Sequence, residues 1–202
     1  MPDEARLALA FAIALAVTLI ATPVAILVAR RTNFHDVPVG YKAHSRATPY
    51  LGGSAVLIGV LAASLPLGDA AGRFGMVTIG AIVLWLVGTI DDRVNLGPGR
   101  RVLVELALGV ALWATDNGWS LGAGGAVDLL VTCAWVAVVV STFAVMDNLD
   151  GAAATVAGVT AAGISVLALI EDDVIAAVIP LALTGACIGF LRYNLARPAR
   201  IF

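Results

Sequence analysis

Seven long apolar runs constrain the fold of this chain more than any other feature. A helix that crosses the hydrocarbon core of a bilayer needs roughly 17–25 mainly apolar residues. The runs that reach or approach this length are 7–29, 51–67, 74–90, 102–115, 126–146, 151–170 and 174–191. They are continuous, whereas a membrane β-strand alternates apolar and polar residues. We therefore predict an all-α, polytopic integral membrane protein with about seven transmembrane helices.

The composition supports this prediction. Of the 202 residues 60% are hydrophobic and 13% are charged, against about 45–50% and about 25% in soluble domains. The formal net charge of −2 excludes a general polyanion binder, and no nucleic acid is expected as a partner. No repeat and no soluble domain is visible, so we predict a single transmembrane domain over 1–202.

The charges at the helix ends predict the orientation. Asp3 and Glu4 precede the first apolar run and Arg30-Arg31 follow it. Cytoplasmic loops are rich in Arg and Lys, so we predict that the N-terminus lies outside. Alternation of the spans then gives the cytoplasmic loops 30–50, 91–101, 144–150 and 191–202, which together hold ten of the twelve basic residues.

Three polar clusters lie on the predicted cytoplasmic face. They are the segment 42–53, the segment from Asp91-Asp92 to Arg101, and the segment 147–151. The simplest interpretation is that these charged residues only mark the ends of helices, and this is sufficient for any one of the Arg residues. It does not explain the Asp residues well, because a carboxylate beside hydrocarbon costs free energy unless a cation binds it. The shared face indicates one site.

The acids of that site indicate a divalent metal. Asp147 and Asp150 are three residues apart, which places both carboxylates on one face of a helical turn. Together with Asp91 and Asp92 they would repel one another. A hard cation with oxygen ligands relieves such repulsion, and Mg²⁺ keeps waters and phosphates in its remaining positions. The sequence has no Cys/His pair with the spacing of a zinc site, so Mg²⁺ and phosphoryl transfer are predicted.

Lys42 is the one Lys among twelve basic residues, and His44 is one of two His. A compact ammonium group at Lys42 suits a phosphate oxygen. The alternative is a solvated lysine of a basic cytoplasmic loop, and the residue type alone leaves both interpretations open.

Together the clusters resemble the polyprenyl-phosphate N-acetylhexosamine-1-phosphate transferases, glycosyltransferase family 4, which include phospho-N-acetylmuramoyl-pentapeptide transferases and undecaprenyl-phosphate N-acetylglucosamine-1-phosphate transferases. The resemblance covers nearly the whole chain. The matching motifs are Lys42-x-His44 through Pro49 and Gly52-Gly53; Gly88-x-x-Asp91-Asp92 with Leu96 and Arg101; Asp147-Asn148-Leu149-Asp150-Gly151; and Phe190-Leu191-x-x-Asn194 followed by Pro198-Ala199-Arg200-Ile201-Phe202.

This resemblance implies transfer of an N-acetylhexosamine 1-phosphate from a UDP-sugar to a polyprenyl phosphate, with release of UMP, in cell-envelope glycan synthesis at the plasma (inner) membrane. It implies Mg²⁺, with Mn²⁺ as the alternative, and leaves a homodimer open. The residue roles that it implies are catalytic for Asp91 and Asp92, metal-binding for Asp91, Asp92 and Asp147, and substrate-binding for Lys42, His44, Arg101, Asp147, Asn148, Asp150 and Asn194. A phosphate monoester is mostly dianionic at neutral pH, because its second pKa is about 6. We therefore favour organisation of charge over base catalysis by Asp91.

Two departures from the family pattern stand out. Ser141 and Ala144 occupy positions where the family usually has Asn, and the family continues beyond Phe202 with Met-Gly-Asp. We therefore expect this chain to be the N-terminal portion of a family member. A truncated or degenerate, non-catalytic membrane subunit is the alternative. A transporter is disfavoured, because its ionisable groups would lie near the bilayer midplane.

Overall fold

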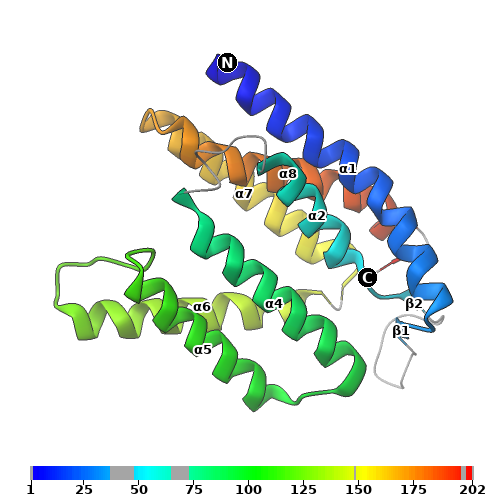
Figure 1. Cartoon of the computed structure of the whole chain (residues 1–202), viewed down its shortest axis with the longest axis horizontal. Coiled ribbons are helices and arrows are strands. Elements are labelled where there is room, and N and C mark those ends of the chain that lie inside the picture. Colours follow the sequence, from blue (N-terminus) through cyan, green and yellow to red (C-terminus); the bar gives the residue numbers. More distant parts are fainter. Residues whose placement is uncertain (1, 37–47, 65–72, 148, 197–198, 202) are drawn as a thin grey trace. The chain divides into compact units, whose positions relative to one another are not determined.

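The computed structural model (Figure 1) describes residues 2–36, 48–64, 73–147, 149–196 and 199–201. Within these ranges the chain forms seven α-helices, and the prediction of an all-α fold is confirmed. The helices, labelled as in Figure 1, are α1 (Asp3–Arg31), α2 (Gly52–Ser64), α4 (Gly75–Val94), α5 (Pro98–Ala114), α6 (Gly125–Met146), α7 (Ala152–Ile170) and α8 (Val174–Asn194).

Five of the described helices, α1, α4, α6, α7 and α8, are long and apolar enough to cross a membrane. The other two, α2 and α5, have 13 and 17 residues and fall in the predicted runs 51–67 and 102–115. Helix α5 begins at Pro98, before the predicted run, because proline suits the first position of a helix. The prediction of a polytopic membrane protein is confirmed.

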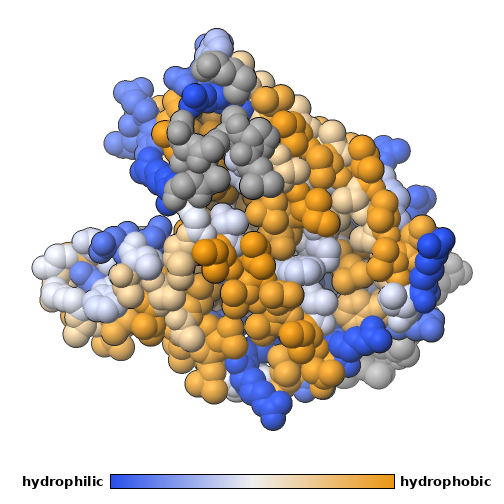
Figure 2. All heavy atoms as spheres, viewed as in Figure 1, coloured by the Kyte–Doolittle hydropathy of each residue, from blue (hydrophilic) through white to orange (hydrophobic). Residues whose placement is uncertain are grey.

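Large apolar side chains lie on the surface. Figure 2 shows hydrophobic residues over much of the visible face, and Ile20, Leu130 and Ile170 are 70%, 69% and 69% exposed. Contiguous exposed apolar patches of this extent are rare in monomeric soluble proteins. The hydrocarbon of a bilayer is the environment that such a surface requires.

By its internal contacts the chain divides into two compact units. Unit 1 comprises residues 1–73 and 147–202, and unit 2 comprises 74–146. Unit 1 holds α1, α2, α7 and α8, and unit 2 holds α4, α5 and α6. The single domain over 1–202 stays a prediction.

Helix α8 is the centre of unit 1 and packs against α1, α2 and α7. A Cβ at Gly185 would lie 2.5 Å from the Phe11 carbonyl oxygen, and one at Gly189 would lie 2.9 Å from that of Leu15. The backbones of α1 and α8 therefore approach closely, as small residues allow in membrane helices. Fully buried alanines of these two helices, among them Ala10, Ala14, Ala182 and Ala186, form a core cluster.

Arg73 and Asp173 form an ion pair within unit 1. The Arg73 guanidinium lies 2.6 Å from Asp173 Oδ2 and donates to Oδ1 at 2.8 Å. The predicted topology places both residues on the outer side of the membrane. The orientation itself stays a prediction.

A two-stranded antiparallel ladder joins β1 (His35–Asp36) to β2 (Thr48–Pro49), with His35 opposite Pro49 and Asp36 opposite Thr48. The prediction contained no strands. The difference is small, because each strand has only two residues.

Candidate functional site

The aspartate pair lies in the last turn of α4. Asn95 ends this helix in the left-handed region with φ 52°, and its N–H donates to the Asp91 carbonyl oxygen. Asn tolerates this conformation better than most residues. Gly97, with φ 82°, and Pro98 then begin α5. The short turn brings the start of α5 back to the end of α4.

Asp91 is engaged through both carboxylate oxygens. Its Oδ1 accepts a hydrogen bond from the Leu96 N–H at 2.7 Å, and its Oδ2 lies 3.0 Å from a guanidinium nitrogen of Arg101. The Asp91 side chain is 16% exposed and that of Arg101 33%. The structure thus brings together two residues that the sequence predicted for one site. Asp92 is exposed at the same helix end.

The third motif is held by residues far away in the sequence. Asp147 follows α6, and Gly151 precedes α7 with φ 75°. The buried side chain of Asn194, at the end of α8, accepts a hydrogen bond from the Gly151 N–H at 2.6 Å and donates to the Ile201 carbonyl oxygen at 2.9 Å. Asn194 therefore connects the third motif to the C-terminal segment. Its predicted contact with substrate stays a prediction.

An apolar cluster supports this end of unit 1. Ile201 is fully buried and packs with Ala25 and Phe190. Leu51, next to the Gly52-Gly53 pair, and Ala154, near the start of α7, pack against the same cluster. The segment around Leu51, the third motif and the C-terminal segment thus meet within one unit.

The metal site predicted from the four acids stays a prediction. Asp91 and Asp92 belong to unit 2, whereas Asp147 and Asp150 belong to unit 1. Within the described ranges, no group of three or more His, Cys, Asp or Glu side chains is arranged to hold a metal ion. Three of the predicted substrate-binding residues, Lys42, His44 and Asn148, lie outside the described ranges.

Desolvation raises the pKa of the Asp147 carboxyl above its usual value, although the residue as a whole is exposed. Desolvation disfavours the charged form of a carboxyl group. A bound cation would favour the charged form of Asp147 again. The raised pKa therefore fits both a metal ligand and an acid that is protonated when no cation is bound.

Glu105 is a polar residue of this region that the sequence reasoning missed. It lies on α5, is 2% exposed and accepts a hydrogen bond from the Ser141 hydroxyl on α6 at 3.0 Å. The signal was present, because Glu105 is the one ionisable residue of the predicted run 102–115. Ionisable groups within membrane spans are rare and usually functional.

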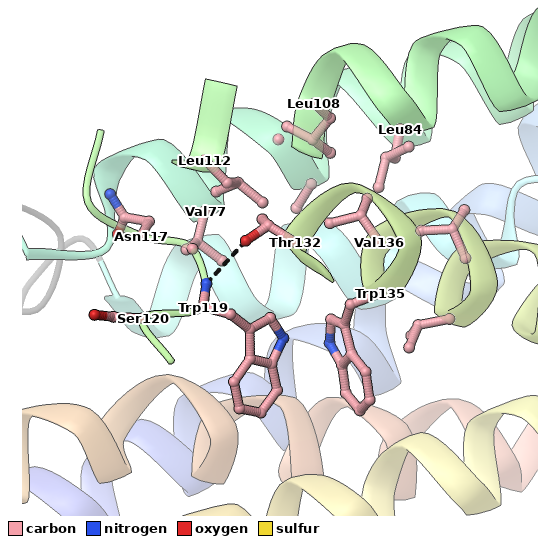
Figure 3. Close-up of a pocket in the computed structure, with 15 residues that line it drawn as sticks. Val77, Leu84, Leu108, Leu112, Asn117, Trp119, Ser120, Thr132, Trp135 and Val136 are labelled. Atoms are coloured by element: carbon pink, nitrogen blue, oxygen red, sulfur yellow. Dashed lines mark hydrogen bonds between the residues drawn. The ribbon is translucent and has the colours of Figure 1, made fainter. Parts of the chain in front are cut away.

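An apolar groove lies elsewhere in unit 2. It has a cavity volume of about 480 Å³ and an apolar lining from α4, α5 and α6. Figure 3 shows the indoles of Trp119 and Trp135 side by side. The backbone N–H of Trp119 donates to the Thr132 hydroxyl at 2.9 Å. Its α4 residues run from Val77 to Leu84, so the groove follows the first half of the helix and is separate from Asp91.

Comparisons with known proteins agree with the motifs. The family model of glycosyl transferase family 4 matches residues 74–202. The probable undecaprenyl-phosphate N-acetylglucosaminyl 1-phosphate transferase of Bacillus subtilis (strain 168) is 29% identical over 98% of this chain and 58% of its own length. The decaprenyl-phosphate N-acetylglucosaminephosphotransferase of Mycobacterium leprae (strain TN) is 31% identical over 98% and 56%.

A third relative, the phospho-N-acetylmuramoyl-pentapeptide-transferase of Heliobacterium modesticaldum, is 32% identical over 96% of this chain and 68% of its own length. The chain thus spans a little over half of the length of the first two relatives and about two thirds of this one. All three are similar to nearly the whole of this chain.

Proposed function

Because the chain belongs to glycosyl transferase family 4, we propose that it forms part of an enzyme that transfers an N-acetylhexosamine 1-phosphate from a UDP-sugar to a polyprenyl phosphate. The observation that carries the proposal is the similarity over nearly the whole chain to relatives named for this class of transfer. The engagement of Asp91 by Arg101 supports it, because phosphoryl transfer depends mainly on positioning and on neutralisation of charge.

In the proposed reaction an oxygen of the lipid phosphate attacks the β-phosphorus of the UDP-sugar. A new phosphorus–oxygen bond forms, and the bond from the β-phosphorus to the bridging oxygen breaks. That oxygen leaves with UMP, and the lipid retains the sugar diphosphate. Little proton removal is needed, because the attacking phosphate is mostly dianionic at neutral pH.

The contacts of Asp91 support a role in organising charge. Each of its carboxylate oxygens already accepts one hydrogen bond, from Leu96 or from Arg101. We propose that Asp91 orients the Arg101 guanidinium toward the phosphates. Lys42, His44 and Arg101 would neutralise the phosphates, while Asn148, Asp150 and Asn194 would contact or position the nucleotide sugar.

Carboxylate oxygens are suitable ligands for Mg²⁺ or Mn²⁺. We propose that Asp92 and Asp147, with Asp91, would hold the ion. Asp92 is exposed at the end of α4, and Asp147 follows the end of α6. When bound, the ion would neutralise charge on the transferred phosphate.

The site is proposed to face the cytoplasm, where nucleotide sugars are made. Ten of the twelve basic residues lie in the predicted inner segments, in agreement with the positive-inside rule. The lipid chain would lie among the spans while its phosphate meets the UDP-sugar at the inner surface.

Asp92→Asn tests the proposed function. The protein that contains this chain would be purified in detergent and assayed for UMP release with Mg²⁺, polyprenyl phosphate and UDP-N-acetylglucosamine. We expect UMP release to fall by at least about 100-fold, because the substitution keeps the shape and removes the charge at an electrostatic site. Asp3→Asn, an exposed acid at the start of α1, is the matched control and should keep the wild-type rate.

Full activity of Asp92→Asn would remove that residue from the mechanism. If the wild-type protein releases no UMP with any UDP-N-acetylhexosamine, the non-catalytic subunit becomes the better interpretation. Parallel assays with other UDP-N-acetylhexosamines would identify the preferred sugar.

A further inference from the structure

Glu105 is a buried carboxyl group that the proposed mechanism does not use. It is 2% exposed and lies in the apolar face along which α5 packs against α6. A polar group in such a place costs free energy unless it forms hydrogen bonds. Its contacts should therefore serve the arrangement of these helices.

Ser141 on α6 is the hydrogen-bond partner found for Glu105 among the described residues. The Ser141 hydroxyl donates to Glu105 Oε2 at 3.0 Å. Inside a membrane there is little hydrophobic driving force between helices, so van der Waals packing and hydrogen bonds determine how helices associate. One polar pair in an otherwise apolar contact is well suited to select a single register.

The contact next to this pair is tight. One turn beyond Glu105, a Cβ at Gly109 would lie 2.7 Å from the Cys133 Cα. The Cys133 thiol also lies 3.7 Å from the Leu106 carbonyl oxygen. Helices α5 and α6 therefore approach closely, and a small axial slide would break the Glu105–Ser141 hydrogen bond.

Both partners are close in sequence to predicted site residues. Glu105 follows Arg101 by one helical turn, and Arg101 contacts Asp91 at 3.0 Å. Ser141 is five residues before Met146, where α6 ends and the chain continues into Asp147. The Glu105–Ser141 hydrogen bond thus connects α5, which carries the Arg101 that contacts Asp91, to α6, which leads into the third motif.

We propose that Glu105 and Ser141 are positioning residues for the transfer reaction. Their hydrogen bond sets the register and rotation of α6 against α5, and so fixes the helix end from which Asp147 extends. Glu105 acts as a hydrogen-bond acceptor in this role, and its negative charge is not required. The inference rests on the proposed function for its effect on catalysis, whereas its effect on helix register is independent of that function.

Kinetics of four variants of the protein that contains this chain test the catalytic part. We expect Glu105→Gln, which keeps an acceptor oxygen, to release UMP within about twofold of the wild-type rate. Glu105→Ala and Ser141→Ala should each lower kcat by about tenfold, with KM for both substrates nearly unchanged. The double variant Glu105→Ala/Ser141→Ala should be no slower than the slower single variant, since contacting residues that act as one unit are not additive.

The matched control is Thr142→Val. Thr142 is adjacent to Ser141, but its hydroxyl donates to the Val138 carbonyl oxygen of its own helix. This variant should keep the wild-type kcat. A kcat loss in Glu105→Gln as large as that in Glu105→Ala, or an additive double variant, would overturn the proposal.

Spin labels test the register without activity. Labels would replace Leu103 on α5 and Val138 on α6, which are 66% and 63% exposed, in a protein whose cysteines Cys133 and Cys187 are changed to Ala. Electron–electron distance measurements should give one narrow distribution for wild type and Glu105→Gln, and a shifted or broader one for Glu105→Ala. An unchanged distribution in Glu105→Ala would overturn the proposal. Absence of UMP release in wild type together with the expected distance change would instead count against the proposed function alone.

Discussion

The aspartate pair and the third motif are held in place by different parts of the chain. The side chain of Asp91 contacts Leu96 and Arg101, which are five and ten residues away. Gly151 is held by Asn194, which is 43 residues away. The aspartate pair is therefore supported by its own helical hairpin, and the third motif depends on the packing of a whole helical unit.

The aspartate pair is thus stabilised by local contacts, and the third motif by tertiary contacts. The Asp91–Arg101 pair requires the end of α4, the turn and the start of α5. The Asn194 contacts require α8 to be seated against α1 and α7, and they are buried, whereas the Asp91–Arg101 pair is partly exposed. Substitutions at the tertiary contact should cost more stability than substitutions at the local one.

Asn194→Ala should have the largest effect on stability. It leaves the buried Gly151 N–H and Ile201 carbonyl oxygen without the partners they have now. Each buried polar group left unsatisfied costs about 1–3 kcal/mol, so for two groups we expect the free energy of unfolding to fall by about 2–6 kcal/mol. Reversible unfolding in mixed detergent–SDS micelles measures it.

The control for this change is Asn117→Ala. Asn117 is exposed, and its side-chain amide contacts Thr115 two residues away. This variant should unfold at the wild-type SDS concentration. Equal losses in both variants would show that the third motif does not depend on tertiary support from Asn194.

Arg101→Ala should have a smaller effect on stability. Partly exposed ion pairs contribute little, so we expect a loss below about 1 kcal/mol in the same unfolding measurement. UMP release should fall much more, by about 100-fold, because the guanidinium is proposed to neutralise phosphate charge. Arg100→Ala, at the exposed neighbouring position, is the control. A stability loss as large as that of Asn194→Ala would contradict the distinction between local and tertiary support.

Asp173→Asn should have the smallest effect on stability. It tests whether the loss of stability depends on how buried a contact is, rather than on how far apart in sequence its partners are. The Ala176 N–H and then the Arg73 guanidinium lower the pKa of Asp173, although Arg73 is 100 residues away. A lowered folded-state pKa stabilises the fold above the unfolded pKa of about 3.9. That contribution is lost as the pH falls through the folded-state pKa.

We therefore expect wild type to have a slightly higher Tm than Asp173→Asn at neutral pH, and the two Tm values to converge in acid. Thermal unfolding from about pH 7 to about pH 3 measures the difference, with Asp172→Asn as the control for a general charge effect. A difference that grows on acidification would contradict the sign of this linkage.

Much of the architecture could be predicted from the sequence. Each of the seven predicted spans overlaps one of the described helices, because a bilayer requires long continuous apolar runs. The contact of Asp91 with Arg101 could also be predicted from the sequence. Asn95, Gly97 and Pro98 favour a short turn, and such a turn places the start of α5 near the end of α4.

The remaining contacts could not be predicted from the sequence. Asn194 matched a motif and is predicted to bind substrate; that its amide also contacts the backbone of Gly151 and Ile201 did not follow from the motif. Ser141 was noted as a departure from the family pattern, and its hydroxyl contacts Glu105. Each of these hydrogen bonds joins residues on different elements, and residue type alone does not say which elements are neighbours.

The sequence by itself determined that the chain enters a membrane, which segments form its helices, and which family it belongs to. These properties follow from runs of adjacent residues and from short motifs, both of which are local. The tertiary structure decided which buried polar groups meet, as in the pairs Glu105–Ser141 and Asn194–Gly151. Such pairs depend on which helix faces come into contact, and close packing between small residues such as Gly109 and Cys133 fixes those faces only when the whole unit folds.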